Sequence, residues 1–189
     1  MMGDYIQLGI EHILDTEALD HLYFIVSFCL LYTIKDLRKI AALVTAFTIG
    51  HSITLALAAL DKISMNPDLI ETLIPITIII SCFLNYWTLL RQTEYQAPKG
   101  YLVYFVILIF GLIHGLGFSN FLSAMLFEGE SIVTPLLGFN IGIEVAQLVI
   151  VLAILTLLWL SDRFLESKKA VRLILNTAVS AVVIQMILT

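Results

Sequence analysis

Charged side chains are scarce in this chain, and their scarcity excludes an ordinary soluble domain. Only 13% of its 189 residues are charged, whereas a soluble domain carries about 25%. Hydrophobic residues make up 60% of the sequence, which indicates a protein that lies in a lipid bilayer. No Ser/Gly-rich linker or long polar stretch divides the chain, so residues 1–189 are predicted to form a single transmembrane domain.

Cysteines and catalytic motifs are equally sparse. The two cysteines, Cys29 and Cys82, fall within apolar stretches and are interpreted as small buried residues rather than as a disulfide or a ligand pair. No cleaved signal peptide is expected, because a basic leader and a small-residue cleavage site are both lacking before the first apolar run. Phosphate-binding glycine loops, an HExxH element and a nucleophile elbow are lacking too. The basic loops are short, which gives nucleic-acid binding no support.

Six apolar stretches have about the 20 residues that a membrane-spanning helix needs. Helices are favoured over a closed barrel, whose sequence would alternate in segments of about ten residues. Residues 5–15 are too short to span and are predicted to form an interfacial or partly inserted helix. The expected fold class is all-α, a polytopic membrane helix bundle of about six transmembrane helices plus this short N-terminal helix. The predicted spans are 17–34, 41–60, 69–90, 101–125, 132–160 and 171–188.

The loops predict an orientation for this bundle. Of the ten basic residues, all but Lys62 follow the first, third or fifth span. Loops rich in lysine and arginine stay in the cytoplasm, so both termini are expected outside. The expected location is a bacterial cytoplasmic (inner) membrane that the chain crosses several times. The opposite loops are rich in aspartate and glutamate, and such a face can raise the local concentration of cations.

Eight polar side chains lie within or just beside the apolar stretches. An ionisable group in hydrocarbon costs about 2.5–3.5 kcal/mol on insertion scales, so such groups are rare and usually functional. A single buried imidazole is as often a hydrogen-bonded core residue as a ligand. Polar residues from five helices at one depth, in the outer half of the bundle, favour a shared metal site. The candidate metal ligands are His12, Asp20, His21, His51, Glu71, His114, Asn140 and Glu144.

The types of these residues indicate which ion the site would take. Imidazole suits nickel, cobalt, zinc, copper(II) and iron, and carboxylates add hard oxygen donors. Methionine or thiolate clusters, which would indicate copper(I), are lacking. Two pairs of glycines, Gly111 with Gly115 and Gly138 with Gly142, have the spacing that lets helix backbones approach closely beside the candidate residues.

The same segments resemble successive motifs of the HupE/UreJ family, membrane proteins associated with nickel and cobalt uptake. GIEHIL, LDHLYF, FTIGHSITLALAAL, PDLIETLIPITI, FGLIHGLGF and GFNIGIEVAQL carry the likeness, which runs from about Gly9 to Gln147. The resemblance implies divalent metal permeation, with nickel or cobalt as the cargo and the eight residues named above as the metal-binding groups. One departure is that Ala18 and Leu19 stand where the family commonly has a glycine before the Asp-His pair.

Three functions stay open at this point. The leading one is a secondary permease, whose partners are the metal ion and the lipid bilayer. The alternative is an intramembrane metalloenzyme that activates a bound water, with Glu71 or Glu144 as base. A weak inner path argues against a simple channel and keeps this alternative open, because below His51 and His114 the second and fourth spans offer mainly Thr45, Thr48 and apolar residues. A structural or sensor metal is the third. Zinc, copper or iron in place of nickel or cobalt, and a homo-oligomer, are also left open.

Overall fold

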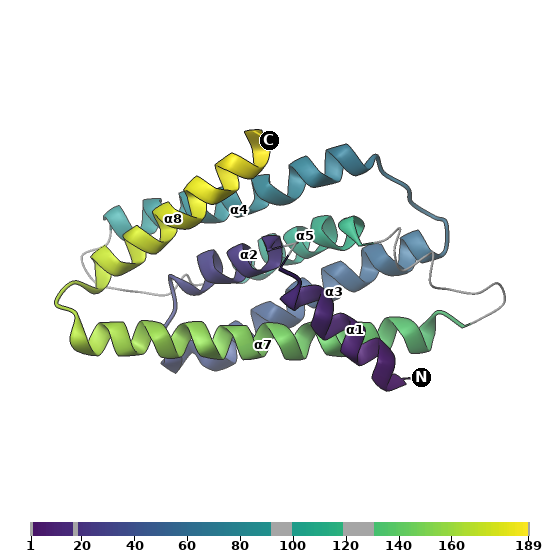
Figure 1. The fold of residues 1–189 in the computed structure, drawn as a ribbon, viewed down its shortest axis with the longest axis horizontal. Coiled ribbons are helices and arrows are strands. Elements are labelled where there is room, and N and C mark those ends of the chain that lie inside the picture. The colour runs from purple at the N-terminus through teal and green to yellow at the C-terminus, as the bar shows by residue number, and fades with distance from the viewer. Residues whose placement is uncertain (1, 17–18, 92–99, 119–130, 189) are drawn as a thin grey trace.

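The computed structural model describes residues 2–16, 19–91, 100–118 and 131–188. All regular secondary structure in these segments is helical, which confirms the all-α class. The helices are α1 (Met2–Leu14), α2 (Asp20–Cys29), the 3-10 helix η1 (Ile34–Asp36), α3 (Leu37–Ala59), α4 (Pro67–Arg91), α5 (Tyr101–Gly117), α7 (Val133–Phe164) and α8 (Lys168–Leu188). They form one elongated bundle (Figure 1).

Four of the described helices are long and apolar enough to cross a membrane: α3 together with η1, α4, α7 and α8. The α5 helix is apolar but has 17 residues. The predicted span 17–34 contains only the ten-residue α2, whose length of about 15 Å is half of the hydrocarbon thickness. A count of six full spans is therefore not confirmed. The predicted span 101–125 runs past α5 into residues 119–125, which lie outside the described residues.

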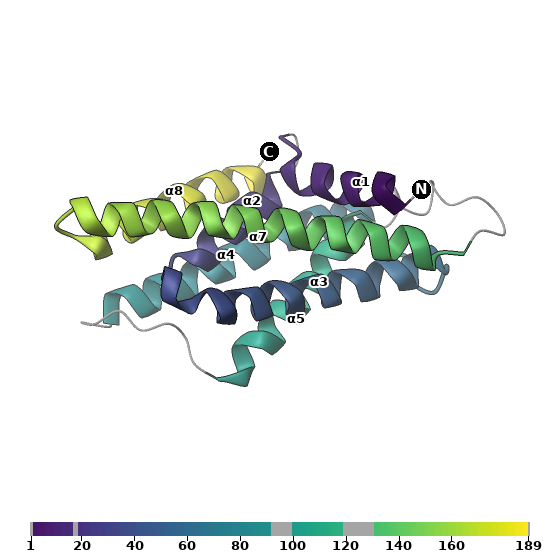
Figure 2. The same ribbon diagram turned by 90° about the horizontal axis from the view of Figure 1, so that it is seen from below.

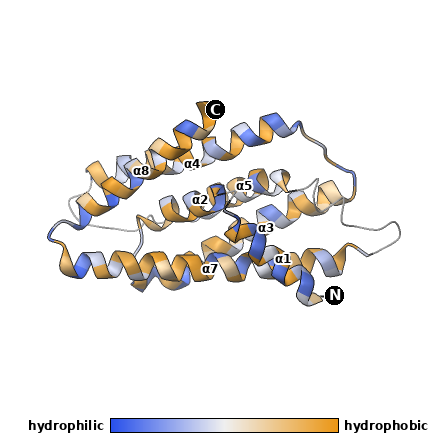
Figure 3. Cartoon of the chain, viewed as in Figure 1, coloured by the Kyte–Doolittle hydropathy of each residue, from blue (hydrophilic) through white to orange (hydrophobic). Residues whose placement is uncertain are grey.

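Large apolar side chains cover the outside of the bundle. Phe83, Leu102 and Leu157 are 62%, 73% and 65% exposed, and further exposed large apolar side chains recur along each of the four membrane-length helices. Such a surface is not typical of a water-soluble protein. Figure 3 shows that the helix middles are largely hydrophobic, whereas hydrophilic residues gather at the turn between α7 and α8 and at the start of α4. Together with the helix lengths, these faces indicate a membrane protein.

The N-terminal helix α1 packs into the bundle. It runs along the first half of α7 and ends in the middle of the molecule, where α2 begins and continues towards the other end (Figure 1). Glycines allow this close approach: a Cβ on Gly9 would overlap the carbonyl oxygen of Phe139, and one on Gly142 would overlap that of Ile6. Two half-length helices, α1 and α2, thus meet at mid-bundle.

A second pair of helices, α3 and α5, packs just as closely. A Cβ on Gly50 would overlap the carbonyl oxygen of Leu108, and one on Gly111 would overlap that of Phe47. Gly115 lies in the same way against His51. The close backbone approach predicted from the glycine spacing is confirmed, and it holds the backbones that carry His51 and His114 against each other.

Buried side-chain amides connect α2 to α4 and α4 to α8 through hydrogen bonds. The Asn85 side-chain amide donates to the Ser27 carbonyl (2.7 Å) and to Asn176 Oδ1 (2.9 Å), and Asn176 in turn donates to the Cys82 carbonyl (3.0 Å). These bonds fix the depth and rotation of a helix too short to hold itself in place. Cys29 and Cys82 are free and buried, as the sequence predicted.

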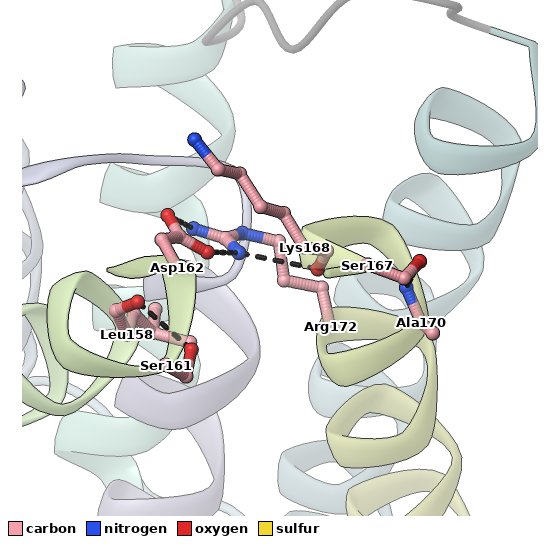
Figure 4. A network of polar contacts seen from close by, with 7 residues as sticks. All are labelled: Leu158, Ser161, Asp162, Ser167, Lys168, Ala170 and Arg172. Atoms are coloured by element: carbon pink, nitrogen blue, oxygen red, sulfur yellow. Dashed lines mark hydrogen bonds and ion pairs between the residues drawn. The ribbon is translucent and has the colours of Figure 1, made fainter. Parts of the chain in front are cut away.

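The basic loops gather at one end of the bundle. The turn between α7 and α8, the start of α3 and the end of α4 lie together at the left in Figure 1 and again in Figure 2. At this end, which we call the basic end, buried Arg172 makes two hydrogen bonds to the Asp162 carboxylate (2.5 and 2.8 Å) and a third to the Lys168 carbonyl (Figure 4). The clustering agrees with the predicted sidedness of the loops, while the orientation in a membrane stays a prediction.

Candidate metal centre

Four imidazoles from four helices converge where α1 and α2 meet. His12 comes from α1, His21 from α2, His51 from α3 and His114 from α5. The ring of His21 is central, with its centroid 4.7 Å from that of His12, 6.0 Å from that of His51 and 5.2 Å from that of His114. Asp20 adds a carboxylate. We call these five residues the histidine cluster.

Ligand atoms in the cluster fall into two overlapping groups. One group is His12, His21 and His51, the other is Asp20, His21 and His114, and the ligand atoms of each lie within 4.8 Å of one another. A metal ion with bonds of about 2.0–2.1 Å to imidazole nitrogen draws its ligand atoms roughly 3–4 Å apart. Small side-chain movements would therefore close either group around an ion. His21 belongs to both.

Several cluster nitrogens are buried and lack a hydrogen-bond partner among the described residues. They are His12 Nε2, His21 Nε2, both ring nitrogens of His51, and His114 Nδ1. A buried polar atom without a partner costs about 1–3 kcal/mol. Satisfied core histidines would not show this pattern. A cation shared among the nitrogen lone pairs would remove the cost at several atoms at once, which favours a metal site.

Asp20 is the first residue of α2, and its carboxylate faces two of the imidazoles. Its Oδ1 lies 3.3 Å from His21 Nδ1, and its Oδ2 lies 4.0 Å from His114 Nδ1. The positive end of the α2 dipole favours the ionised carboxylate. The break between α1 and α2 thus provides a negative group at mid-bundle.

Thr77 of α4 sets which nitrogen His114 can offer to an ion. The Thr77 hydroxyl donates its single hydrogen to the Ile74 carbonyl (2.7 Å) and also lies 3.0 Å from His114 Nε2. With the Thr77 hydrogen on the Ile74 carbonyl, His114 donates from Nε2 and keeps a lone pair on the Nδ1 that faces Asp20. A hydrogen bond of this kind to the distal nitrogen is typical of metal-binding histidines. Sequence reasoning missed Thr77, because nothing in the sequence separates it from the other threonines of α4.

A pocket of about 490 Å³ adjoins the cluster. His12, Asp20, His21 and His114 form its inner wall, and Asp15 and Glu71 add two further acids. Glu71 is exposed and belongs to neither ligand group. Glu71 thus lines the pocket outside both ligand groups, and its contact with a metal ion stays a prediction.

The comparison with known families agrees with this geometry. A family model described as HupE / UreJ protein matches residues 1–189. The chain belongs to the HupE/UreJ family. The match confirms the resemblance and extends it over the last helix as well. No curated protein and no solved structure matches the chain.

The other two predicted ligands of this HupE/UreJ protein lie on α7, outside both ligand groups. The Asn140 side-chain amide donates to the Leu136 carbonyl (2.7 Å), and its Oδ1 is buried without a partner among the described residues. The Glu144 carboxylate accepts a hydrogen bond from the Thr45 hydroxyl (2.5 Å). Direct metal ligation by Asn140 and Glu144 stays a prediction.

Aromatic rings close the cluster on two sides. Phe118 lies 4.1 Å from the His12 ring and stacks on Phe139 at 4.8 Å. Towards the basic end, Phe47 lies 5.2 Å from the His114 ring and stacks on Phe24 at 5.0 Å. These rings shield the imidazoles on the two sides away from the pocket, and the electrostatic attraction between a cation and its ligands is stronger in apolar surroundings.

Proposed function

We propose that this HupE/UreJ protein is a secondary permease for a divalent transition metal, with nickel or cobalt as the first candidates. The observation that carries the proposal is the convergence of four imidazoles and Asp20, with unpartnered nitrogens, beside an acidic pocket. The family supports a role related to nickel or cobalt transport. The same donors also bind zinc, copper(II) and iron, so the metal must be identified by measurement.

In this proposal the ion passes through the pocket and then the cluster. Glu71 contacts the hydrated ion in the pocket. Asp20 and the four histidines replace the water that the ion loses. Asn140 and Glu144 contact it at other stages of its passage.

Two overlapping ligand groups suit a permeating ion better than one rigid site. Because His21 belongs to both groups, its ring can serve an ion in either of them, and an ion that leaves one group meets a ligand of the other. Conduction requires binding that is favourable enough to capture the ion and weak enough to release it. A stepwise exchange of ligands meets both requirements.

The driving force follows from the proposed orientation, with both termini outside a cytoplasmic membrane. A membrane potential that is negative inside favours cation entry by about 2.3 kcal/mol per charge per 100 mV. A divalent ion gains roughly twice that free energy. Inward movement then needs no nucleotide and no coupled ion.

Uptake of radioactive nickel or cobalt into proteoliposomes tests the proposal. We expect uptake above that of empty vesicles, faster when a potassium gradient with valinomycin makes the interior negative. The His21→Ala variant, which loses the ligand common to both groups, should show the background rate. Absence of uptake for every first-row divalent ion would contradict the permease.

The pocket also supports a second candidate, an intramembrane metalloenzyme. A catalytic metal keeps an open coordination position, and a pocket of about 490 Å³ beside three-ligand groups has room for a substrate. A metal-bound water would be the nucleophile and Glu71 its base. Metal retained through prolonged dialysis would favour this enzyme, whereas rapid exchange with added radioactive metal would favour the permease.

A further inference from the structure

Polar side chains continue beyond the histidine cluster towards the basic end. On α3, Thr45 and Thr48 precede His51 at intervals of three residues, which places all three on one helix face. On α7, Glu144 and Gln147 lie opposite them. We call Thr45, Thr48, Glu144 and Gln147 the inner polar layer.

Hydrogen bonds between the two helices define this layer. The Thr45 hydroxyl lies 2.5 Å from Glu144 Oε1, and the Thr48 hydroxyl lies 3.2 Å from Gln147 Oε1. Thr48 and Gln147 are buried. Thr45 lies six positions before His51, a rise of about 9 Å, and Thr48 lies about 4.5 Å before it. Glu144 belongs to neither ligand group of the histidine cluster, so the layer begins one helical turn below the cluster and extends away from it.

Both threonine hydroxyls have a second acceptor on their own helix. Thr45 Oγ1 lies 3.1 Å from the Ala41 carbonyl, and Thr48 Oγ1 lies 3.1 Å from the Val44 carbonyl. Since a hydroxyl has a single hydrogen, each can turn from the α7 side chain to its own backbone. Turning would free an oxygen lone pair on Glu144 and on Gln147, which now accept from the two threonines.

Glu144 gives the layer its charge. It lies on a helix long enough to span a membrane, and in the described part of the chain no lysine, arginine or histidine forms an ion pair with it. A carboxylate at such a depth is usually functional and has a partner. Within the layer only hydroxyl and amide groups surround it, so a mobile cation is the partner that the position lacks.

We propose that the inner polar layer is a second, weaker cation station that receives the metal ion from the histidine cluster on its way to the basic end. This inference rests on the proposed permease. The cluster binds through imidazole nitrogens, whereas the layer has only oxygen donors, which hold nickel or cobalt less tightly. Affinity that falls along the path is what release requires.

The inner polar layer also offers an ion a way around the rings of Phe24 and Phe47. Phe47 and Phe24 stack beneath the cluster and block a direct route along α3 and α5. The polar faces of α3 and α7 pass beside Phe47, because Thr48 is its neighbour in the helix. A route between α3 and α7 would avoid the two rings, because the side chains that meet there are polar.

The test separates metal binding from metal transport. Glu144→Gln keeps the size of the side chain and its ability to accept from Thr45, but removes the charge. We expect equilibrium binding of nickel by the purified protein to change less than twofold, while the initial rate of uptake into proteoliposomes falls at least tenfold. Retained binding also shows that the variant is folded.

Thr45→Val is the second variant, and Thr156→Val is its matched control. Thr45→Val removes the hydroxyl donor to Glu144 and should lower the uptake rate severalfold with binding unchanged. Thr156 is an exposed residue of α7 whose hydroxyl bonds only to the Leu152 carbonyl. Loss of the Thr156 hydroxyl should alter neither binding nor uptake.

The outcomes distinguish this inference from the proposed function. If the wild-type protein transports metal and Glu144→Gln transports it equally fast, the inner station is wrong and the permease stands. If Glu144→Gln loses nickel binding as severely as His21→Ala, Glu144 belongs to the histidine cluster and a separate station is again wrong. Absence of wild-type uptake would overturn the permease, and the inner station with it.

Discussion

The substitution His21→Ala should remove tight metal binding more completely than any other single change in the cluster. His21 is the one residue common to both ligand groups, and its ring is close to those of His12, His51 and His114. Its loss leaves two imidazoles in one group and a single imidazole with a carboxylate in the other. Neither remainder can hold an ion with three protein ligands.

The expected magnitude follows from the position of the ring. Removing a group that only orients a ligand typically weakens metal binding 10–100-fold. Loss of a ligand from both groups should exceed 100-fold, or about 2.7 kcal/mol. His51→Ala and His114→Ala each break one ligand group and should also cost tight binding, though less than His21→Ala. His12→Ala should weaken binding least, because His12 is the one imidazole of the cluster that is only half-buried, so water can replace it.

Isothermal titration of the purified protein with nickel measures this effect, and thermal unfolding with and without nickel checks it. Without metal, His21→Ala should unfold near the wild-type temperature, because the change also removes a buried nitrogen that lacks a partner. With metal, only the wild-type protein should be stabilised. Wild-type affinity in His21→Ala together with loss of binding in His12→Ala would refute the reasoning. The site would then lie at the pocket mouth, with the other imidazoles serving as core residues.

Three further predictions concern the surroundings of the cluster. Thr77→Val, which removes the hydrogen bond that orients His114, should weaken nickel binding 10–100-fold in the same titration. Gly111→Ala should destabilise the protein by about 1–3 kcal/mol and lower its unfolding temperature, because the added Cβ would overlap the Phe47 carbonyl. Gly3→Ala is the control: Gly3 has open space around it, so this substitution should leave the unfolding temperature unchanged. Reporter fusions after Lys39 and Lys169 should report the cytoplasm and one after Lys62 the outside, and the reverse pattern would overturn the proposed orientation.

The histidine cluster was largely predictable because rare residues in apolar helices are informative. The basic loops predict which end of each helix lies at the cytoplasmic side, and the rise per residue then gives the depth of every side chain in the bundle. Depth alone was enough to bring His21, His51 and His114 to one level. The same reasoning gave Glu144 a similar depth but not its rotation about the axis of α7. In the structure Glu144 is directed towards Thr45 of α3. A single sequence does not show which neighbouring helix a side chain contacts.

The sequence predicts a weak path for an ion from the histidine cluster to the basic end, because α3 and α5 have few polar side chains in that region. Gln147 was missed, and its contact with Thr48 is what joins α7 to the polar face of α3. A glutamine within a long apolar run is a signal of the same kind as the histidines. Glutamine is uncharged and is not a common metal ligand, so a prediction built on ionisable residues does not include it. The lesson is that neutral polar residues in apolar helices should be placed by depth together with the ionisable ones.

The first apolar run shows why hydropathy overestimates the number of spans. The run is long enough to cross, but α2 ends at Cys29 and the chain turns before Thr33. There the Thr33 backbone and hydroxyl both donate to Asp36 Oδ2 (3.0 and 2.8 Å) and so begin the next helix. Hydropathy does not detect this capping.

The shortened helix has a consequence for function: its N-terminus lies inside the bundle rather than at a surface, and non-helical backbone at such depth is tolerated where it lines a cavity. Asp15, in the break between α1 and α2, lines the pocket. Because α2 begins at Asp20, this carboxylate lies at the positive end of the helix dipole, which favours its ionised form. Asp15 and Asp20 thus bring two acidic groups to the pocket that a permeating cation would enter.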